Sequence, residues 1–142
     1  MPKVPDSPIS VSVTHISLQG ARQAIAAAQA EAARGGWHIS VAIVDTGGRL
    51  VAFARDDAAI GISPDVAIAK ARTAALLQIP SKEFEDFINA GRPSFLATPG
   101  ATPLEGGIPL CLNGTVIGAI GVSGAHGPND TQVAQAGASV IG

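Results

Sequence analysis

The fold of this chain is indicated most clearly by residues 110–122, which read LCLNGTVIGAIGV. Two apolar runs flank Asn113-Gly114, and a type I′ turn needs positive φ at both central residues, which Asn and Gly tolerate. The stretch therefore predicts a β-hairpin with strands at 110–112 and 115–122. Gly118 and Gly121 inside the second strand predict that another backbone or a ligand approaches it closely.

A second hairpin is predicted upstream. Residues 37–44 are rich in β-branched side chains, the turn residues 45–48 follow, and residues 49–55 continue as a second strand. Both faces of this hairpin are apolar, so we expect the sheet to be covered on both sides. Residues 11–15 are either a further short strand or a lead-in to the first helix.

Two helices are predicted by apolar spacing and by capping residues. Ser17 is expected to cap the first, whose apolar residues recur at spacings of three and four until Gly35-Gly36 ends it. The motif Ser63-Pro64-Asp65 predicts a second helix with Ser63 as the capping hydroxyl, and Pro80 ends it.

The remaining segments predict two more helices and a loop. Ser81 is expected to cap a shorter helix, residues 94–97 form a short strand in a loop rich in Pro and Gly, and Asn129 or Asp130 caps a final helix. The order is helix, hairpin, two helices, hairpin, helix. It predicts an α/β (α+β) domain with an antiparallel sheet of four to five strands and helices on both faces.

One domain accounts for the chain length of 142 residues. We expect residues 1–10, which hold three prolines, to be a flexible N-terminal arm, and residues 11–142 to be the domain. The arm lacks the apolar segment of a signal peptide, and no apolar run reaches membrane-spanning length. A cytoplasmic protein with no membrane partner is therefore expected.

The composition narrows the range of partners. Charged residues make up 14% of the chain and the net charge is −2, with no basic stripe, so we expect no nucleic-acid partner. So few charges suggest that other subunits cover part of the surface, as in a homo-oligomer. Cys111 is the single cysteine and no two histidines have the spacing of metal ligands, so no zinc site is expected.

Histidines are the candidate haem ligands. A neutral imidazole at an apolar pocket can ligate haem iron. His15 lies just before the first helix and His126 lies in a Gly-rich loop before the last helix, so either can serve. The alternative for both is an exposed histidine with no ligand. We interpret His38 as a residue at the end of a strand.

Basic residues and a glycine-rich turn are candidates for holding an anion. Lys70 either extends its ammonium group to water or points into a pocket. Arg72 is expected to be exposed or between subunits, and Arg55 to pair with Asp56 or Asp57. The turn that contains Gly121, Ser123 and Gly124 can hold a carboxylate through its N–H groups, but it lacks both nucleotide-binding fingerprints, so no nucleotide is expected.

Two acids are candidates for proton transfer. Glu105 stands beside Gly106-Gly107, which lets it approach a ligand without steric cost, and it can act as a general base once desolvated. Asp130 is a second candidate for this role. The ordinary interpretation is a turn residue for Glu105 and a helix cap for Asp130.

Several stretches together resemble the GlcG/HbpS family, and the likeness runs in order from about residue 17 to the end of the chain. The stretches are 41–45 with 47–51, 69–74, 103–109 and 116–124, with Asp130 and 134–137 matching the last helix. The resemblance implies a profilin-like domain that assembles into dimers and up to octamers. It also implies haem binding in some members, including PduO C-terminal domains, and a place in aromatic degradation for others.

The leading hypothesis is a cytoplasmic, oligomeric small-ligand-binding protein, with haem as the ligand that the resemblance favours. His15 or His126 would bind the iron, and Lys70 and Arg55 would be available for the propionates.

Two alternatives stay open. The first is a small cofactor-independent hydrolase, isomerase or lyase acting on an unsaturated carboxylic acid from aromatic or organic-acid catabolism. Lys70 or Arg72 would hold the carboxylate, Glu105 or Asp130 would move a proton, and the turn at 121–124 would stabilise an oxyanion. The second is a non-catalytic regulatory or structural subunit.

Overall fold

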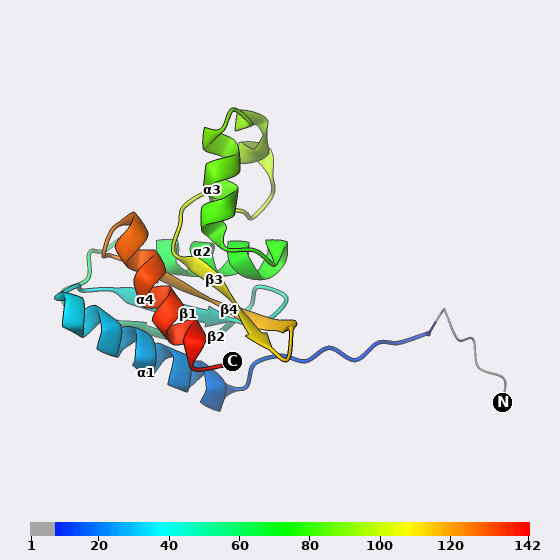
Figure 1. The fold of residues 1–142 in the computed structure, drawn as a ribbon, viewed down its shortest axis with the longest axis horizontal. Helices are drawn as coiled ribbons and strands as arrows, with labels where there is room; N and C mark the ends of the chain where they lie inside the picture. The colour runs from blue at the N-terminus through cyan, green and yellow to red at the C-terminus, as the bar shows by residue number, and fades with distance from the viewer. Residues whose placement is uncertain (1–7) are drawn as a thin grey trace.

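A four-stranded antiparallel sheet forms the centre of the protein in a computed structural model that describes residues 8–142 (Figure 1). The strands are β1 (Ser40–Val44), β2 (Leu50–Arg55), β3 (Gly107–Leu112) and β4 (Thr115–Ser123), in the order β2-β1-β4-β3. The predicted α+β class and both hairpins are confirmed. Residues 11–15 form no strand, and residues 1–7 of the predicted arm lie outside the described residues.

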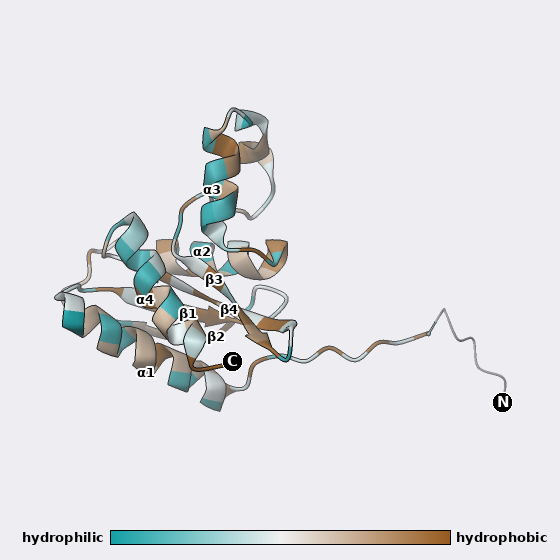
Figure 2. Ribbon diagram, viewed as in Figure 1, coloured by the Kyte–Doolittle hydropathy of each residue, from teal (hydrophilic) through white to brown (hydrophobic). Residues whose placement is uncertain are grey.

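Helices cover the sheet unequally. They are α1 (Leu18–Gly35), α2 (Ser63–Leu77), α3 (Ser81–Asn89) and α4 (Gly127–Ser139), with a 3₁₀ helix η1 at Pro93–Ala97. One apolar cluster joins α1 and α4 to one face, and a second joins the alanines of α2 to the other. Figure 1 shows α3 and η1 rising away from the sheet, and Figure 2 shows apolar residues concentrated in the strands. Among the described helices, none has the length and apolar character needed to cross a membrane.

The β3–β4 hairpin has the predicted turn and the predicted close approach. Asn113 and Gly114 have φ values of 52° and 77°, as a type I′ turn requires. A Cβ atom at Gly121 would collide with the carbonyl oxygen of Ala67 on α2. The missing side chain thus lets α2 lie directly against β4, which fixes the position of every side chain that α2 presents there.

The predicted cap is confirmed at α1, and the capping serines predicted for α2 and α3 were wrong. Ser17 Oγ accepts the N–H of Gly20 at 3.0 Å and caps α1. Ser63 and Ser81 are the first residues of their helices and cap neither. Ser63 Oγ lies 2.9 Å from Ser40 Oγ, and Ser81 Oγ donates to the carbonyl of Leu104 at 2.6 Å. Ser63 Oγ also donates to the carbonyl of Ile60 at 2.7 Å. Both hydroxyls are buried, and their bonds go to groups other than the N–H groups at the start of their own helices.

Three other local predictions were wrong. Residues 94–97 belong to a 3₁₀ helix and not to a strand. The residue before α4 is His126, and neither Asn129 nor Asp130 caps that helix, since both lie inside it. The expectation of two covered faces holds for β1, which is buried throughout, but not for β2, which is an edge strand with exposed residues.

Candidate functional site

Three separate hollows each contain one of the three histidines. His15 lines a groove of about 290 Å³, His126 a cavity of about 290 Å³ and His38 a hollow of about 370 Å³. The surroundings of the three imidazoles differ in polarity. The hypotheses for haem and for an enzyme therefore fall on different parts of the protein.

The walls of the groove beside His15 contain no Asp, Glu, Lys or Arg. Its walls come from the start of α1, the β3–β4 hairpin and the end of the chain, and its apolar residues are Ile16, Leu112, Ile117, Val140 and Ile141. His15 Nδ1 accepts the backbone N–H of Thr46 at 3.3 Å and lies 2.9 Å from the Thr46 hydroxyl. Nδ1 is an acceptor here, so the proton of the neutral ring is on Nε2, and iron binding through Nε2 requires the other tautomer, in which Nδ1 donates to the Thr46 hydroxyl.

The cavity beside His126 collects most of the other predicted site residues. Lys70 comes from α2, Glu105 from the loop before β3, Ser123 and Gly124 from the end of β4, and Asp130 from α4. Three of the stretches that carry the family resemblance (69–74, 103–109 and 116–124) and Asp130 therefore converge on one cavity, although they are far apart in the chain.

Lys70 points into the protein and does not extend to water. Its Nζ donates to the carbonyl of Val122 and to Oδ2 of Asp130, each at 3.0 Å, and the two side chains are 5% and 3% exposed. The second oxygen of Asp130 accepts the N–H of Ala125 at 2.8 Å. The ion pair is thus held by backbone groups on both sides.

Glu105 makes the cavity predominantly acidic. Its buried carboxylate accepts the hydroxyl proton of Thr131 at 2.5 Å, and its N–H donates to Glu85 Oε1 at 3.4 Å. Three carboxylates line the cavity (Glu85, Glu105 and Asp130) against the single ammonium group of Lys70. This balance disfavours a carboxylate ligand and favours an uncharged or cationic one.

The backbone of His126 is strained. Its φ of 70° and ψ of 125° lie in a region that residues with a side chain rarely adopt. The neighbouring Gly124 and Gly127 also have positive φ. His126 is exposed at the edge of the cavity. Because strained backbone is concentrated at functional sites, His126 is a candidate for a functional role.

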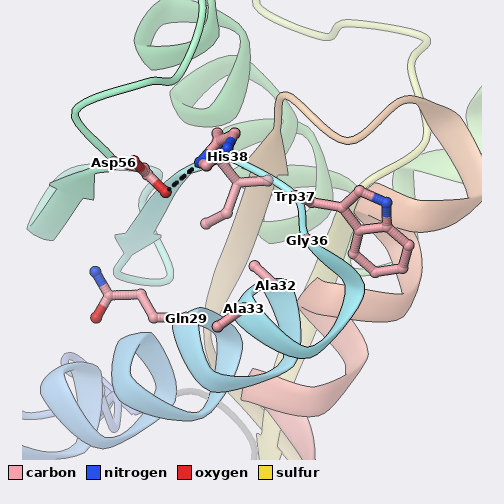
Figure 3. Close-up of a pocket in the computed structure, with 8 residues that line it drawn as sticks. Gln29, Ala32, Ala33, Gly36, Trp37, His38 and Asp56 are labelled. Carbon is pink, nitrogen blue, oxygen red and sulfur yellow. Dashed lines mark hydrogen bonds and ion pairs between the residues drawn. The ribbon is translucent and has the colours of Figure 1, made fainter.

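His38 and Asp56 form a pair that the sequence interpretation missed (Figure 3). His38 Nδ1 lies 3.0 Å from Asp56 Oδ2, and the other oxygen of Asp56 accepts the N–H of Ala58 at 3.0 Å. The bond from Ala58, followed by that from His38, lowers the pKa of the Asp56 carboxyl. The sequence contained a signal for this pair. His38 and Asp56 flank the two strands of one predicted antiparallel hairpin, which brings them side by side, and Asp56 N–H donates to Ile39 C=O.

The comparison with known proteins now decides the family. Residues 16–139 match the family model for haem degrading protein HbpS-like. This chain belongs to the HbpS-like family. It is 44% identical to protein GlcG of Escherichia coli K12 over 108 residues, which are 76% of this chain and 81% of GlcG.

Solved structures agree with this assignment of the HbpS-like chain. A double mutant of Streptomyces reticuli HbpS matches with a TM-score of 0.88 and 36% identity, over 100% of this chain and 97% of that one. The PduOC–haem complex matches with a TM-score of 0.80 and 27% identity, over 90% of this chain and 96% of that one.

Some predicted residues of the HbpS-like chain lie away from its hollows. Arg55 donates to the carbonyl of Ala59 at 3.5 Å, and the predicted ion pair with Asp56 or Asp57 was wrong because Asp56 pairs with His38. Arg72 is exposed on α2, and neither arginine lines the three hollows. Gly121 packs against α2 and not against a ligand space. Across residues 8–142, no three His, Cys, Asp or Glu side chains gather as metal ligands.

Proposed function

We propose that this HbpS-like protein binds haem in the groove that His15 lines, with this histidine as the axial ligand. One observation carries the proposal. His15 stands at a groove without charged side chains and Thr46 holds its Nδ1, so Nε2 is the nitrogen that binds iron once the ring proton has shifted to Nδ1 and is donated to the Thr46 hydroxyl. The haem complex of the relative PduOC supports the choice of ligand.

The groove fits part of a flat apolar ligand. Its volume of about 290 Å³ is at the lower limit for a small-molecule pocket, so haem would extend over the rim. Leu112 and Val140 on that rim are exposed apolar residues that can contact the porphyrin.

The cavity beside His126 fits haem less well. Its three carboxylates repel propionates, and its ammonium group is already paired with Asp130. Lys70 lies in this cavity, and Arg55 lines neither space, so the propionates of haem at His15 would face solvent.

A haemin titration followed by absorbance tests the proposal. We expect a saturable Soret shift with the unaltered protein and with His126→Ala and His38→Ala, and loss of the axial-ligand spectrum with His15→Ala. Added imidazole should restore that spectrum in His15→Gly, because the free ligand occupies the space of the missing side chain. An unchanged spectrum in His15→Ala contradicts the proposal.

A second candidate function rests on the polar cavity. Glu105 and the strained His126 line the same space as the buried Lys70–Asp130 pair, an arrangement suited to moving a proton. We infer a cofactor-independent isomerase, lyase or hydrolase, with Glu105 transferring the proton and Asp130 holding Lys70. The acidic lining of the cavity favours an uncharged substrate over the unsaturated carboxylic acid that the sequence analysis expected for an enzyme.

Screening matched acids and amides of small unsaturated compounds tests this second function. We expect turnover of the amides, loss of turnover in Glu105→Gln, and retention in Lys82→Gln, which alters an exposed residue outside the cavity. Turnover that survives Glu105→Gln rules out this second function.

We further propose that the protein is a cytoplasmic homo-oligomer. If neither haem binding nor turnover is found, our proposal is a regulatory subunit.

A further inference from the structure

The leading segment (residues 8–15) has the pattern of a strand but no strand partner. Ile9, Val11 and Val13 alternate with Ser10, Ser12 and Thr14. Such alternation of β-branched and polar residues is typical of a strand with one buried face. Here Ile9 is fully exposed, Val11 is 77% exposed and Val13 is 59% exposed.

The leading segment leaves the body beside the sheet. Ile16 N–H donates to the carbonyl of Ile117 at 2.8 Å, which ties the end of the segment to β4. From there the chain runs away from the domain, as Figure 1 shows. Eight extended residues reach about 26 Å, far enough to contact another molecule.

One edge of the sheet is closed. Val122 N–H donates to Gly106 C=O, so Gly106 bonds inward to β4. Along an antiparallel strand, residues alternate between bonding to the partner strand and facing away from it. Gly107 and Pro109 therefore direct their backbone nitrogens outward from β3. Ser81 Oγ accepts the N–H of Gly107 at 2.8 Å, and Pro109 has no N–H. Strand β3 therefore offers few donors to an incoming strand.

The other edge is open. Asp56 N–H donates to Ile39 C=O, and by the same alternation Phe53 and Arg55 direct their backbone N–H and C=O groups outward from β2. No proline occurs in β2, and no strand of residues 8–142 pairs with its outer side. An unprotected edge of this kind is a template for strand addition.

The open edge also exposes apolar side chains on one face. A register shift in the β1–β2 pairing places Leu50 opposite Val44 and Phe53 opposite Ala42. Val44 and Ala42 pack under α2. Leu50 and Phe53 therefore share that face, and they are 52% and 36% exposed because α2 packs on β1, β4 and β3. The uncovered apolar row of the leading segment and this uncovered face are complementary.

We propose that residues 9–14 of one copy of this chain add as a fifth strand to β2 of a second copy, with Ile9, Val11 and Val13 beside Leu50 and Phe53. A second copy is the occupant because each molecule carries one such segment and one such edge, in equal amounts. Reciprocal exchange satisfies both in a closed dimer. Thr14 at the end of this strand also lines the groove beside His15, so the interface is tested without haem.

Two matched double variants of the full chain test the proposal, both studied without haem. Ile9→Asp/Val11→Asp places two charges on the apolar row, and Ser10→Asp/Ser12→Asp places the same charges on the polar row. Light scattering after size exclusion gives the mass, and hydrogen exchange gives the protection of the β2 amides. We expect the first variant to lose the dimer and at least tenfold of the β2 protection, while the second keeps both.

Each other outcome overturns the proposal. A monomeric unaltered protein would show that no exchange occurs. A dimer or β2 protection that survives Ile9→Asp/Val11→Asp would show that another surface, such as β2 against β2, makes the contact. If Ile9→Asp/Val11→Asp loses hydrogen-exchange protection in other elements but not in β2, the leading segment docks at a different place.

Discussion

The ammonium group of Lys70 on α2 lies 3.0 Å from Oδ2 of Asp130 on α4, and the two residues are separated by 60 positions in the chain. The pair joins helices from opposite faces of the sheet at the end of β4. Because both side chains are buried, neither charge can be satisfied by water if its partner is removed.

Removing one partner of this pair should destabilise the fold strongly. We expect Lys70→Met and Asp130→Leu each to lower the free energy of unfolding by about 3–5 kcal/mol, because a buried charge is left unpaired. The double variant Lys70→Met/Asp130→Leu should lower the free energy of unfolding by less than the sum of the two single changes. Urea denaturation measures all three, and an additive double variant would mean that the charges do not interact.

A methyl group at Gly121 should disrupt the contact between α2 and β4. We expect Gly121→Ala to lower the free energy of unfolding by about 3 kcal/mol, because the new Cβ atom meets the carbonyl oxygen of Ala67. Gly61→Ala is the matched control, since that position has open space. Thermal denaturation of both compares them, and equal stabilities would contradict the close packing.

The Asp56 carboxyl should titrate below its ordinary value of 3.8, because Ala58 N–H and His38 stabilise the ionised form. A lowered pKa in the folded state gives stability that is present above about pH 4 and is lost as the pH falls through the folded value. His38→Ala should raise the pKa only part of the way, because the larger cause, the bond from Ala58, remains. Carbon-detected NMR titration measures this, and a complete return to 3.8 would show that His38 is the dominant cause.

Thr46 should support haem binding without contacting iron. Thr46→Val keeps the shape of the side chain but removes the oxygen beside His15 Nδ1, so we expect haemin affinity to fall about tenfold. Thr115→Val, at an exposed position of the other hairpin, is the control. Affinities come from the same absorbance titration, and an unchanged value for Thr46→Val would mean that the hydroxyl does not orient the ring.

The element order could be predicted because its signals are local. Asn113-Gly114 and Gly35-Gly36 act through their own backbone angles, which depend little on distant residues. Ser63 and Ser81 were assigned wrongly because capping rules are local, whereas Ser81 Oγ donates to Leu104 C=O far along the chain, and Ser63 Oγ donates to Ile60 C=O and also lies against Ser40 Oγ. The exposure of β2 was missed for the same reason, since apolar residues on both faces do not reveal which strand lies at the edge.

The candidate site was predictable in its residues but not in its grouping. Lys70, Glu105 and Asp130 were each recognised from their immediate surroundings. The sequence could not show that they share one cavity while His15 lies in another, because that separation depends on the long-range packing of α2 and α4. The acidic balance of the cavity, which changes the expected substrate, also emerges only when Glu85 of α3 is placed there.

Pro109 has a consequence for solubility at high concentration. In the proposed dimer each sheet gains one strand at β2, and its opposite edge is β3, where Pro109 offers no N–H for another molecule. Growth of the sheet at the β3 edge is therefore disfavoured. The leading segment therefore finds one docking edge on each molecule, at β2, and not a second one at β3 that would link dimers into longer assemblies.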